Sequence, residues 1–285
     1  RVFVSSFGDY TNDRRLFFLI IRRPPTPTLL PYTTLFRSGV PTFTDVAQQA
    51  GVAVIGEPDR GIGASWGDYN NDRRLDLLFS REGDSRLWRN DGPDVNGVWR
   101  FTDVSNQGGF ETVLGLGFWG GGFADLDNDG WLDIVLANRM NGENRVLLNN
   151  GDETFREVTQ ELGMLLADLP SMGFVAGDRD NDGDLEVVIV SHTPVASEPQ
   201  GGGFEGDPNF VWVNNERGNN WVQFRLTGTL SNVEAVGARI EILTRLRPGT
   251  TPVWQSREIS AGTGFFSDFP RTQTFGLGKG ARVER

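Results

Sequence analysis

The chain has 285 residues, of which 38% are hydrophobic and 23% charged, and its formal net charge is −11. This acidity argues against nucleic acid and anionic membranes as partners. The absence of cysteine excludes disulfides and thiolate chemistry, and no apolar run reaches the roughly 18 residues of a membrane-spanning helix.

A repeat runs through the chain from its first residues. Each copy joins a short strand of small or aromatic residues to an acidic loop and then to an apolar strand. The four copies are FGDYTNDRRLFFLI from Phe7, WGDYNNDRRLDLLFS from Trp66, FADLDNDGWLDIVLA from Phe123 and VAGDRDNDGDLEVVIV from Val175. They begin about 55 residues apart, a period that suits a supersecondary unit repeated along the chain.

Two further landmarks keep step with the acidic loops: a third strand that ends in an Asn-containing turn, and a closing F-T-D-V-like strand. The third-strand segments are RLWRNDG at 86–92, RVLLNNG at 145–151 and FVWVNN at 210–215, and the closing segments are PTFTDVAQQAG at 41–51, WRFTDVSNQGG at 99–109 and TFREVTQELG at 154–163. Four-stranded units that cannot bury their own faces predict an all-β chain with blades of a partial β-propeller. A β-solenoid agrees less well, because its repeats are usually shorter. Three units are nearly complete, so we expect more blades upstream.

Residues 1–38 hold an irregular partial copy. Phe17 replaces the acid at position 9 of the loop, and prolines at 24, 25, 27 and 31 would each remove a donor from a strand ladder. The segment 17–38 resembles translated sequencing-adapter sequence, and the alternative is a degenerate edge blade that keeps the repeat spacing. We favour the artefact and assign no function to this segment.

Propeller blades are predicted for residues 39–219, with one long interruption. The segment 191–209 is rich in Gly, Pro and acid and takes the place of a short hairpin turn, so it predicts a long surface loop. Such loops often carry binding, and the alternative is a flexible insertion without function. His192 in this loop is the only histidine, which excludes histidine-based triads and His-rich zinc sites.

The repeat stops at Asn220. Apolar residues alternate at 222–226 and again at 238–242, with turn residues between them. This alternation predicts a separate, small β-rich module over residues 220–285.

Two of the acidic loops follow the complete pattern D-x-[DN]-x-D-G-x-x-[DE]. Side chains at positions 1, 3 and 5 turn toward one ion, glycine at position 6 permits a sharp reversal, the main-chain carbonyl at position 7 adds a neutral oxygen, and the acid at position 9 closes the shell. The predicted ligands are Asp125, Asp127, Asp129, Trp131 and Asp133 in one loop, and Asp178, Asp180, Asp182, Asp184 and Glu186 in the other. Because all these ligands are oxygens, the pattern predicts Ca²⁺ in both loops.

Other interpretations of the two loops are weaker. An EF-hand is excluded because position 12 is Leu136 or Ile189 within a strand-like run, instead of a glutamate before a helix. A hairpin made polar by Asx-turns would need no metal. However, two carboxylates at about 5 Å cost on the order of 3 kcal/mol at an effective dielectric near 20, and two full matches in register favour a bound cation.

A third loop carries Arg73 where glycine belongs. Arginine at this tight position costs backbone strain and places a cation near the site, so calcium binding is an open question here. Its ligands would be Asp68, Asn70, Asp72 and Asp76. The loop that begins at Asp9 keeps too few acids and is expected to hold no ion.

Other candidate residues have simpler explanations. Trp66, Trp119 and Trp131 are candidates for a sugar-binding platform, but packing within and between blades is the better explanation of aromatic residues in such units. The polar run NDGPDVNG at 90–97 predicts hairpin-turn chemistry. No G-x-S-x-G, phosphate-binding or dinucleotide motif occurs in its required context.

The repeats resemble a known family. DLDNDGWLDIVLAN and DRDNDGDLEVVIVS, interleaved with FTDV and LLNNG, resemble FG-GAP/VCBS-type propeller repeats, similar to those of integrin α-subunits. VGARIEILT at 236–244, QSREISAGTGFFSD at 255–268 and TFGLG at 274–278 resemble the ASPIC/UnbV domain of the cartilage acidic protein-like family. The resemblance implies calcium-stabilised blades, with the loops between first and second strands, in an extracellular, cell-surface or periplasmic protein.

These observations together predict a non-enzymatic, calcium-binding propeller that serves in extracellular adhesion or protein interaction, with a protein or glycan ligand that the sequence does not name. One alternative is a carbohydrate-binding propeller that uses the tryptophans and the 191–209 loop. Another is a propeller hydrolase or lyase. Against an enzyme stand the single histidine and the absence of a nucleophile–base pair, although acids alone catalyse such reactions.

Overall fold

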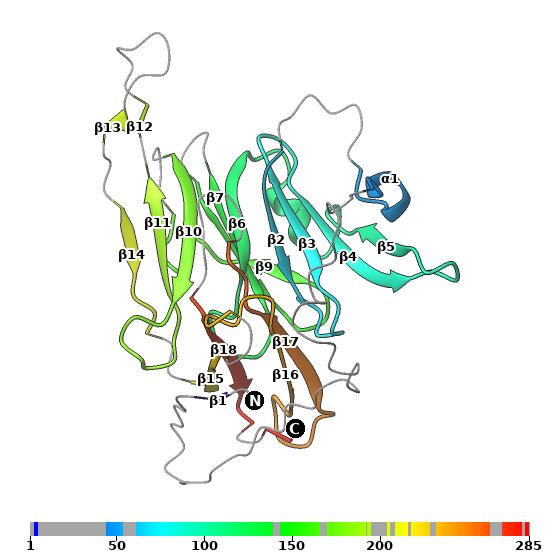
Figure 1. Cartoon of the computed structure of the whole chain (residues 1–285). Helices are drawn as coiled ribbons and strands as arrows, with labels where there is room; N and C mark the ends of the chain where they lie inside the picture. Colours follow the sequence, from blue (N-terminus) through cyan, green and yellow to red (C-terminus); the bar gives the residue numbers. More distant parts are fainter. Residues whose placement is uncertain are drawn as a thin grey trace.

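The structure of the chain is a computed structural model that describes residues 3–4, 44–53, 61–138, 143–165, 170–191, 193–194, 204–205, 209–215, 218–228, 232–262, 270–280 and 283–284. These residues form mainly antiparallel β-sheets, arranged as a fan with a smaller β unit beneath it (Figure 1). The segment 17–38, the loop at Asp9, His192 and most of the 191–209 loop lie outside the described residues, so what the sequence predicts for them stays a prediction.

Two four-stranded sheets follow the predicted repeat strand by strand. The first has the order β2-β3-β4-β5 and the second β6-β7-β8-β9, so each strand pairs with its neighbour in sequence. The strands are β2 Gly61–Gly67, β3 Asp76–Arg81, β4 Arg86–Pro93, β5 Trp99–Asp103, β6 Phe118–Ala124, β7 Asp133–Asn138, β8 Arg145–Asn149 and β9 Phe155–Glu157. The prediction of four-stranded units is confirmed for these two blades.

The third blade has three strands among the described residues. They are β10 Ser171–Gly177, β11 Glu186–Ser191 and β14 Phe210–Trp212, in the order β10-β11-β14. Between β11 and β14 the chain forms a small hairpin, β12 Thr193–Pro194 with β13 Phe204–Glu205, which projects from the end of the blade (Figure 1). The long loop predicted at 191–209 therefore contains a pair of two-residue strands.

The strand register places every acidic loop at the same corner of its blade. The residue before position 1 lies opposite the acid at position 9: Gly67 pairs with Asp76, Ala124 with Asp133, and Gly177 with Glu186. Each acidic loop thus joins the first strand of a blade to the second, as the family resemblance implies.

The first strands of the three blades, β2, β6 and β10, lie next to one another in the middle of the fan (Figure 1). Glycines permit this close approach. A Cβ added to Gly120 would lie 2.7 Å from the Met172 carbonyl oxygen, and one added to Gly67 would overlap the ring of Phe123. The small residues that open each repeat are therefore required where backbones meet.

The middle blade is buried on both faces. Ile134 and Leu136 of β7 belong to the core shared with the first blade, whereas Val135 belongs to the core shared with the third blade. A strand covered on both sides needs a continuous apolar run instead of alternation, which explains the run at 134–137. Each such side chain contributes about 1.5–3 kcal/mol when it is fully buried.

Short helical turns occur beside the first two blades. Helix α1, Ala47–Ala50, follows residues 44–46, which are not a strand although the F-T-D-V pattern predicted one. Asp45 Oδ1 accepts the backbone N–H of Ala47 at 2.9 Å, and this local bond favours a turn over an extended chain. The 3₁₀ helix η2, Phe110–Val113, contributes both of its end residues to the first core. No helix in the described part of the chain is long and apolar enough to cross a membrane.

The C-terminal strands build a core of their own. β15, Asn220–Thr227, pairs with β18, Thr272–Gly278, and β16, Arg239–Thr244, pairs with β17, Val253–Glu258. Strand β1, Phe3–Val4, pairs with β15 and therefore joins this C-terminal module instead of a blade. The buried core residues of the module include Phe224, Ile240, Ile242, Ile259 and Phe275.

The C-terminal module lies against the end of the fan that carries the acidic loops (Figure 1). The backbone N–H of Gly278 donates to the Asn128 carbonyl at 2.9 Å, and that of Gly276 donates to Asp125 Oδ2 at 3.0 Å. A Cβ on Gly276 would collide with the backbone of Asn128. The module and the loop of the second blade are therefore in direct backbone contact.

Candidate metal centres

Each acidic loop turns twice through the left-handed region of backbone conformation. At position 4, Asn71, Asn128 and Asn181 have φ of 56°, 55° and 62°. At position 6, Gly130 and Gly183 both have φ of 94°, whereas Arg73 has φ of 72°. Asparagine and glycine tolerate this region best, which explains the recurring Asn-Asp-Gly run in physical terms.

In the second-blade loop, one carboxylate oxygen each of Asp125, Asp127 and Asp133 lies within 4.8 Å of the others. Asp125 and Asp133 are only 2% and 1% exposed. Burial away from water, with repulsion from neighbouring acids, raises the pKa of Asp125 to about 7 and that of Asp129 to about 8, and it raises the pKa of Asp133 well above its usual range. A cation at this point would keep the carboxylates ionised at neutral pH.

The hydrogen bonds leave one oxygen of Asp125 available for such a cation. Its Oδ2 accepts the backbone N–H groups of Gly130 at 3.2 Å and Gly276 at 3.0 Å. Its Oδ1 is buried and receives no hydrogen bond within the described residues. A buried carboxylate oxygen without a donor costs free energy, so its presence beside two other acids agrees with a ligand role.

The third-blade loop repeats this arrangement. One oxygen each of Asp178, Asp180 and Glu186 lies within 4.8 Å of the others. Asp178 Oδ2 accepts from Gly183 N at 3.0 Å and from Gln223 Nε2 of the C-terminal module at 2.6 Å. Asp178 Oδ1 and Glu186 Oε1 are buried and receive no hydrogen bond from any described residue. This loop therefore offers two such oxygens.

Position 5 has different neighbours from positions 1, 3 and 9, and the main-chain carbonyls at position 7 stay a prediction. Asp129 and Asp182 are not among the three grouped acids of their loops. Each instead accepts, through Oδ1, the backbone N–H two residues later, from Trp131 at 2.9 Å and from Asp184 at 3.1 Å. The structure thus brings positions 1, 3 and 9 together and leaves position 5 as an Asx-turn residue.

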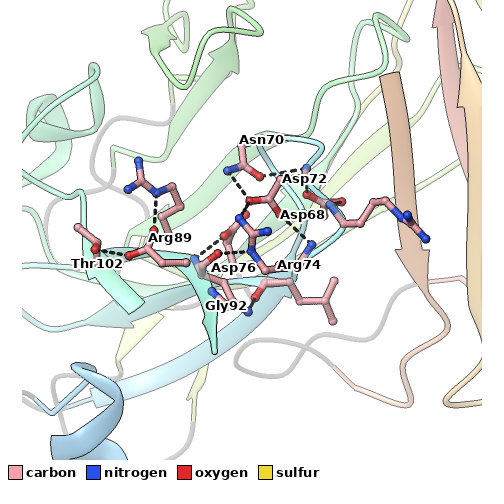
Figure 2. Close-up of polar contacts among 12 residues, drawn as sticks. Asp68, Asn70, Asp72, Arg74, Asp76, Arg89, Gly92 and Thr102 are labelled. Atoms are coloured by element: carbon pink, nitrogen blue, oxygen red, sulfur yellow. Dashed lines mark hydrogen bonds and ion pairs between the residues drawn. The ribbon is translucent and has the colours of Figure 1, made fainter. Parts of the chain in front are cut away.

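The first-blade loop is arranged differently. Asp68, Asn70, Asp72 and Asp76 are linked by hydrogen bonds to one another and to the backbone (Figure 2). Among the described residues, grouped acids at metal-binding distance occur only in the other two loops. Burial raises the pKa of Asp68 to about 6 and that of Asp76 to about 8.

Asparagines connect the loops of successive blades, which the sequence analysis did not predict. Asn71 Nδ2 donates to the carbonyl of Gly130 at 3.0 Å, and Asn128 Nδ2 donates to the carbonyl of Gly183 at 3.1 Å. In both cases position 4 of one loop contacts position 6 of the next. The recurrence of asparagine at position 4 of every aligned loop was the available signal.

A buried arginine of the C-terminal module lies beside the second-blade loop. Arg257 is 8% exposed, and its Nη2 lies 3.8 Å from Asp125 Oδ2. Its guanidinium lies over the ring of Phe275, 5.1 Å from the centroid. Burial lowers the pKa of Arg257, and Asp125 opposes that shift. Arg257 lies in the segment 255–268 that carries the family resemblance, but nothing in the sequence indicated its contact with Asp125, because the two residues are about 130 positions apart.

Two other candidates from the sequence are Trp66, for sugar binding, and Asp94, for a hairpin turn. Trp66 is 56% exposed, and its ring packs beside Phe101 with centroids 6.1 Å apart. Asp94 Oδ1 accepts the backbone N–H of Asn96 at 2.8 Å, as the hairpin-turn prediction requires.

Comparisons with known proteins agree with these features. The family model described as FG-GAP-like repeat matches residues 68–136 and 125–189, and the model described as ASPIC and UnbV matches residues 228–285. Cartilage acidic protein 1 of Homo sapiens is 28% identical over 251 residues, which are 84% of this chain and 34% of the relative. The Mus musculus protein of the same name is 27% identical over 262 residues, or 87% of this chain and 36% of the relative. The Xenopus tropicalis protein is 27% identical over 250 residues, with 84% and 34% covered.

The chain spans about a third of the length of these curated relatives. Their similarity extends through both the blades and the C-terminal module, and both family models fall on the elements described above. The chain is therefore a repeat protein that combines FG-GAP-like repeats with an ASPIC and UnbV domain and is homologous to cartilage acidic protein 1.

Proposed function

We propose that this chain is a non-enzymatic, calcium-binding part of an extracellular propeller, in which one Ca²⁺ in the second-blade loop and one in the third-blade loop hold the blades in register. The observation that carries the proposal is the set of buried carboxylate oxygens without donors: Asp125 Oδ1, Asp178 Oδ1 and Glu186 Oε1. Calcium is the divalent cation favoured by flexible shells of oxygen ligands.

A fastening role suits the position of the loops. Each one joins two strands of a blade, contacts the neighbouring blade through an asparagine, and meets the C-terminal module on its outer side. Asp125 and Glu186 are each 2% exposed. An ion held by such residues is poorly placed to meet a substrate, whereas it would stabilise the folded arrangement by binding to it selectively.

The proposed extracellular setting rests on the relatives and on calcium supply. The similar proteins are named for cartilage, a tissue that consists largely of extracellular matrix. Extracellular calcium modules generally bind with dissociation constants of about 10⁻⁴–10⁻³ M, so weak sites are filled there. Adhesion or protein interaction would then use the exposed hairpins that the calcium-fastened blades hold in place.

Terbium luminescence tests the two sites directly. We expect the parent chain to show sensitised Tb³⁺ emission that Ca²⁺ competes away. Asp127→Asn and Asp180→Asn should each remove about half of the bound Tb³⁺, because each removes one grouped carboxylate. Asp152→Asn is the matched control, since Asp152 is an exposed turn acid whose Oδ1 accepts from Thr154 N. No saturable emission in the parent chain would reject the proposal.

A specific observation also favours a second candidate, binding of a small carbohydrate. A cleft of about 370 Å³ between the blades and the C-terminal module is lined by Trp66, Arg225 and Gln273, among others. An exposed indole beside hydrogen-bonding side chains is suited to a sugar ring. A glycan array with the parent chain and Trp66→Ala separates this function from the first: carbohydrate binding predicts a signal that Trp66→Ala abolishes.

A further inference from the structure

The first-blade loop lacks the free oxygen that the other two loops offer at position 1. Asp68 Oδ1 accepts the backbone N–H of Asp72 at 3.0 Å, and Asp68 Oδ2 accepts that of Arg73 at 2.9 Å. In the second-blade loop the corresponding N–H, that of Asp129, donates to Asp127 Oδ1 at 3.1 Å instead. The N–H of Asp72 also reaches the side chain at position 3, Asn70 Oδ1, at 3.3 Å, so the first-blade loop shares this donor between positions 3 and 1. The additional bond occupies the oxygen of Asp68 that would face an ion.

The acid at position 5 is also occupied, by a positive charge. Asp72 Oδ2 accepts from the guanidinium of Arg74 and from Asn70 Nδ2, the latter at 3.1 Å, while Asp72 Oδ1 accepts the N–H of Arg74 at 2.8 Å (Figure 2). The equivalent Oδ2 atoms of Asp129 and Asp182 receive no hydrogen bond among the described residues. The amide of Asn70, at position 3, is thereby engaged as a donor to Asp72.

The side chain of Arg74 also contacts strand β4 of the same blade. Arg74 Nε donates to the Asn90 carbonyl at 2.6 Å. Gly92 of β4 has φ of 85°, and a Cβ there would lie 3.4 Å from Arg74 Cδ, so the end of β4 passes close to the arginine. Figure 2 shows Arg74 between Asp72 of the acidic loop and Gly92 of β4, so one guanidinium links the loop to the third strand of the blade.

Arg73, which has a left-handed backbone conformation, binds the C-terminal module through its guanidinium. Its Nε and Nη2 donate to Glu241 Oε1 at 3.2 Å and Oε2 at 2.7 Å, and its guanidinium lies 4.7 Å from the ring centroid of Trp254. Arg239 of the module donates to the Arg73 carbonyl. Position 6 thus makes an ion pair here where the other loops place a glycine.

From this contrast we infer that the 68–76 loop takes no calcium, because backbone N–H groups engage both oxygens of Asp68 and the guanidinium of Arg74 pairs with Asp72. Arg73 fastens the C-terminal module to the same loop. Blades of one protein are then held by two different cations: Ca²⁺ in the second and third blades, which depends on the surroundings, and arginine in the first, which is built into the chain. The first blade would keep its loop structure when calcium is removed.

Calorimetric titration with Ca²⁺ tests the number of sites. The inference predicts two ions per parent chain and three in Arg73→Gly/Arg74→Asp, which restores the Asp-Gly-Asp-Leu order of residues 182–185. Arg89→Gln is the matched control, because Arg89 is an arginine of the same sheet that pairs with Asp91 and Glu153 outside the loop. Three ions in the parent chain, or no gain in the double variant, would overturn the inference while leaving the two proposed calcium sites intact.

A second measurement does not depend on calcium at the other loops. In calcium-free buffer, Arg74→Gln should lower the melting temperature of the full chain by several degrees more than Arg89→Gln does, because Arg74, unlike Arg89, joins Asp72 of the loop to the third strand. Equal melting temperatures for the two variants would overturn the inference. Absence of calcium binding in the parent chain would reject the proposed function instead, and the comparison of Arg74→Gln with Arg89→Gln would still decide the role of Arg74.

Discussion

At position 6 of the acidic loops, a single residue decides what each loop can contact. Glycine lets the backbone turn at φ of 94° and leaves room for the module, so that a Cβ on Gly183 would overlap the indole of Trp221. Arginine at φ of 72° instead accepts roughly 1–2 kcal/mol of conformational strain and supplies a bidentate ion pair. The residue at position 6 therefore determines how each loop contacts the C-terminal module, while other positions of the same loop supply the proposed metal ligands.

Gly183→Ala should destabilise the chain by about 2 kcal/mol or more, because it combines a left-handed backbone with a steric clash in the module contact. Gly163→Ala is the control, since Gly163 has φ of 66° with nothing within 4 Å of an added Cβ. That variant should lose only about 1 kcal/mol. Urea unfolding measures both values. Equal losses would show that Trp221 does not press on the loop.

The buried acids predict an unusual pH dependence in calcium-free buffer. The pKa values of Asp125 and Asp129 are raised by burial to about 7 and about 8, above the value of 3.8 for an exposed aspartate. A raised pKa means that the folded state binds protons more tightly than the unfolded state. Stability from these groups is therefore present below about pH 4 and is lost as pH rises through 7 and 8.

Differential scanning calorimetry at several pH values checks this dependence. The melting temperature of the calcium-free chain should fall between pH 6 and pH 8.5, and saturating Ca²⁺ should remove most of the fall because the ion compensates the ionised carboxylates. A melting temperature that rises through this interval without calcium would contradict the assigned direction.

At the scale of strands and blades, the sequence predicted well what is local and repeated. The apolar run after the acidic loop predicted a strand, which is β7, and the position of the loop between the first two strands followed from the order of segments in the repeat. The all-β class and the four-strand unit followed from the same regularity. Residues 44–46 were predicted wrongly because a local bond from Asp45 outweighed the strand pattern.

What the sequence did not predict depends on contacts between units. The asparagine bonds from one loop to the next, the pairing of β1 with β15, and the burial of Arg257 all join residues far apart in the chain. The sequence also did not show that the acids of the second- and third-blade loops are grouped, whereas those of the first-blade loop are engaged in hydrogen bonds. It depends on whether the N–H of position 5 reaches the acid at position 1 in addition to the side chain at position 3, which the residue types do not determine.

Removing the asparagine hydrogen bonds between blades should lower the unfolding free energy by different amounts at the two positions. Asn128→Gly keeps the left-handed turn at position 4 but removes donors to the Gly183 carbonyl and to Asp184 Oδ1. Asn71→Gly removes one donor, to the Gly130 carbonyl, at a less buried site. Since an unsatisfied buried group costs about 1–3 kcal/mol, Asn128→Gly should lose more unfolding free energy than Asn71→Gly. The reverse order in chemical unfolding would show that these bonds do not hold the blades together.

At the scale of the whole molecule, the C-terminal module packs against the ends of the blades that carry the acidic loops. It bonds to Asp125 through Gly276, to Asp178 through Gln223 and to Arg73 through Glu241, so it meets all three described loops. Its Arg257 adds a buried positive charge beside the second-blade loop. Two of the proposed metal ligands, Asp125 and Asp178, therefore also bind the C-terminal module.

Arg257→Met should reveal this sharing. Removing one partner of a buried charge pair typically lowers the unfolding free energy by about 3–5 kcal/mol. We expect a loss of about this size for Arg257→Met without calcium. With saturating Ca²⁺ the loss should be smaller, because the ion compensates Asp125 in place of the guanidinium. Unfolding free energies measured in both conditions provide the comparison. The same loss with and without calcium would mean that Arg257 and the ion act independently.

We propose that two of the three described loops hold calcium and that an arginine replaces it in the third. Crystals of the full chain grown with Ca²⁺ and measured for anomalous scattering locate the ions individually. We expect one peak among Asp125, Asp127 and Asp133, a second among Asp178, Asp180 and Glu186, and none beside Asp68. A peak between Asp68 and Asp72, or no peak at the other two loops, would contradict it.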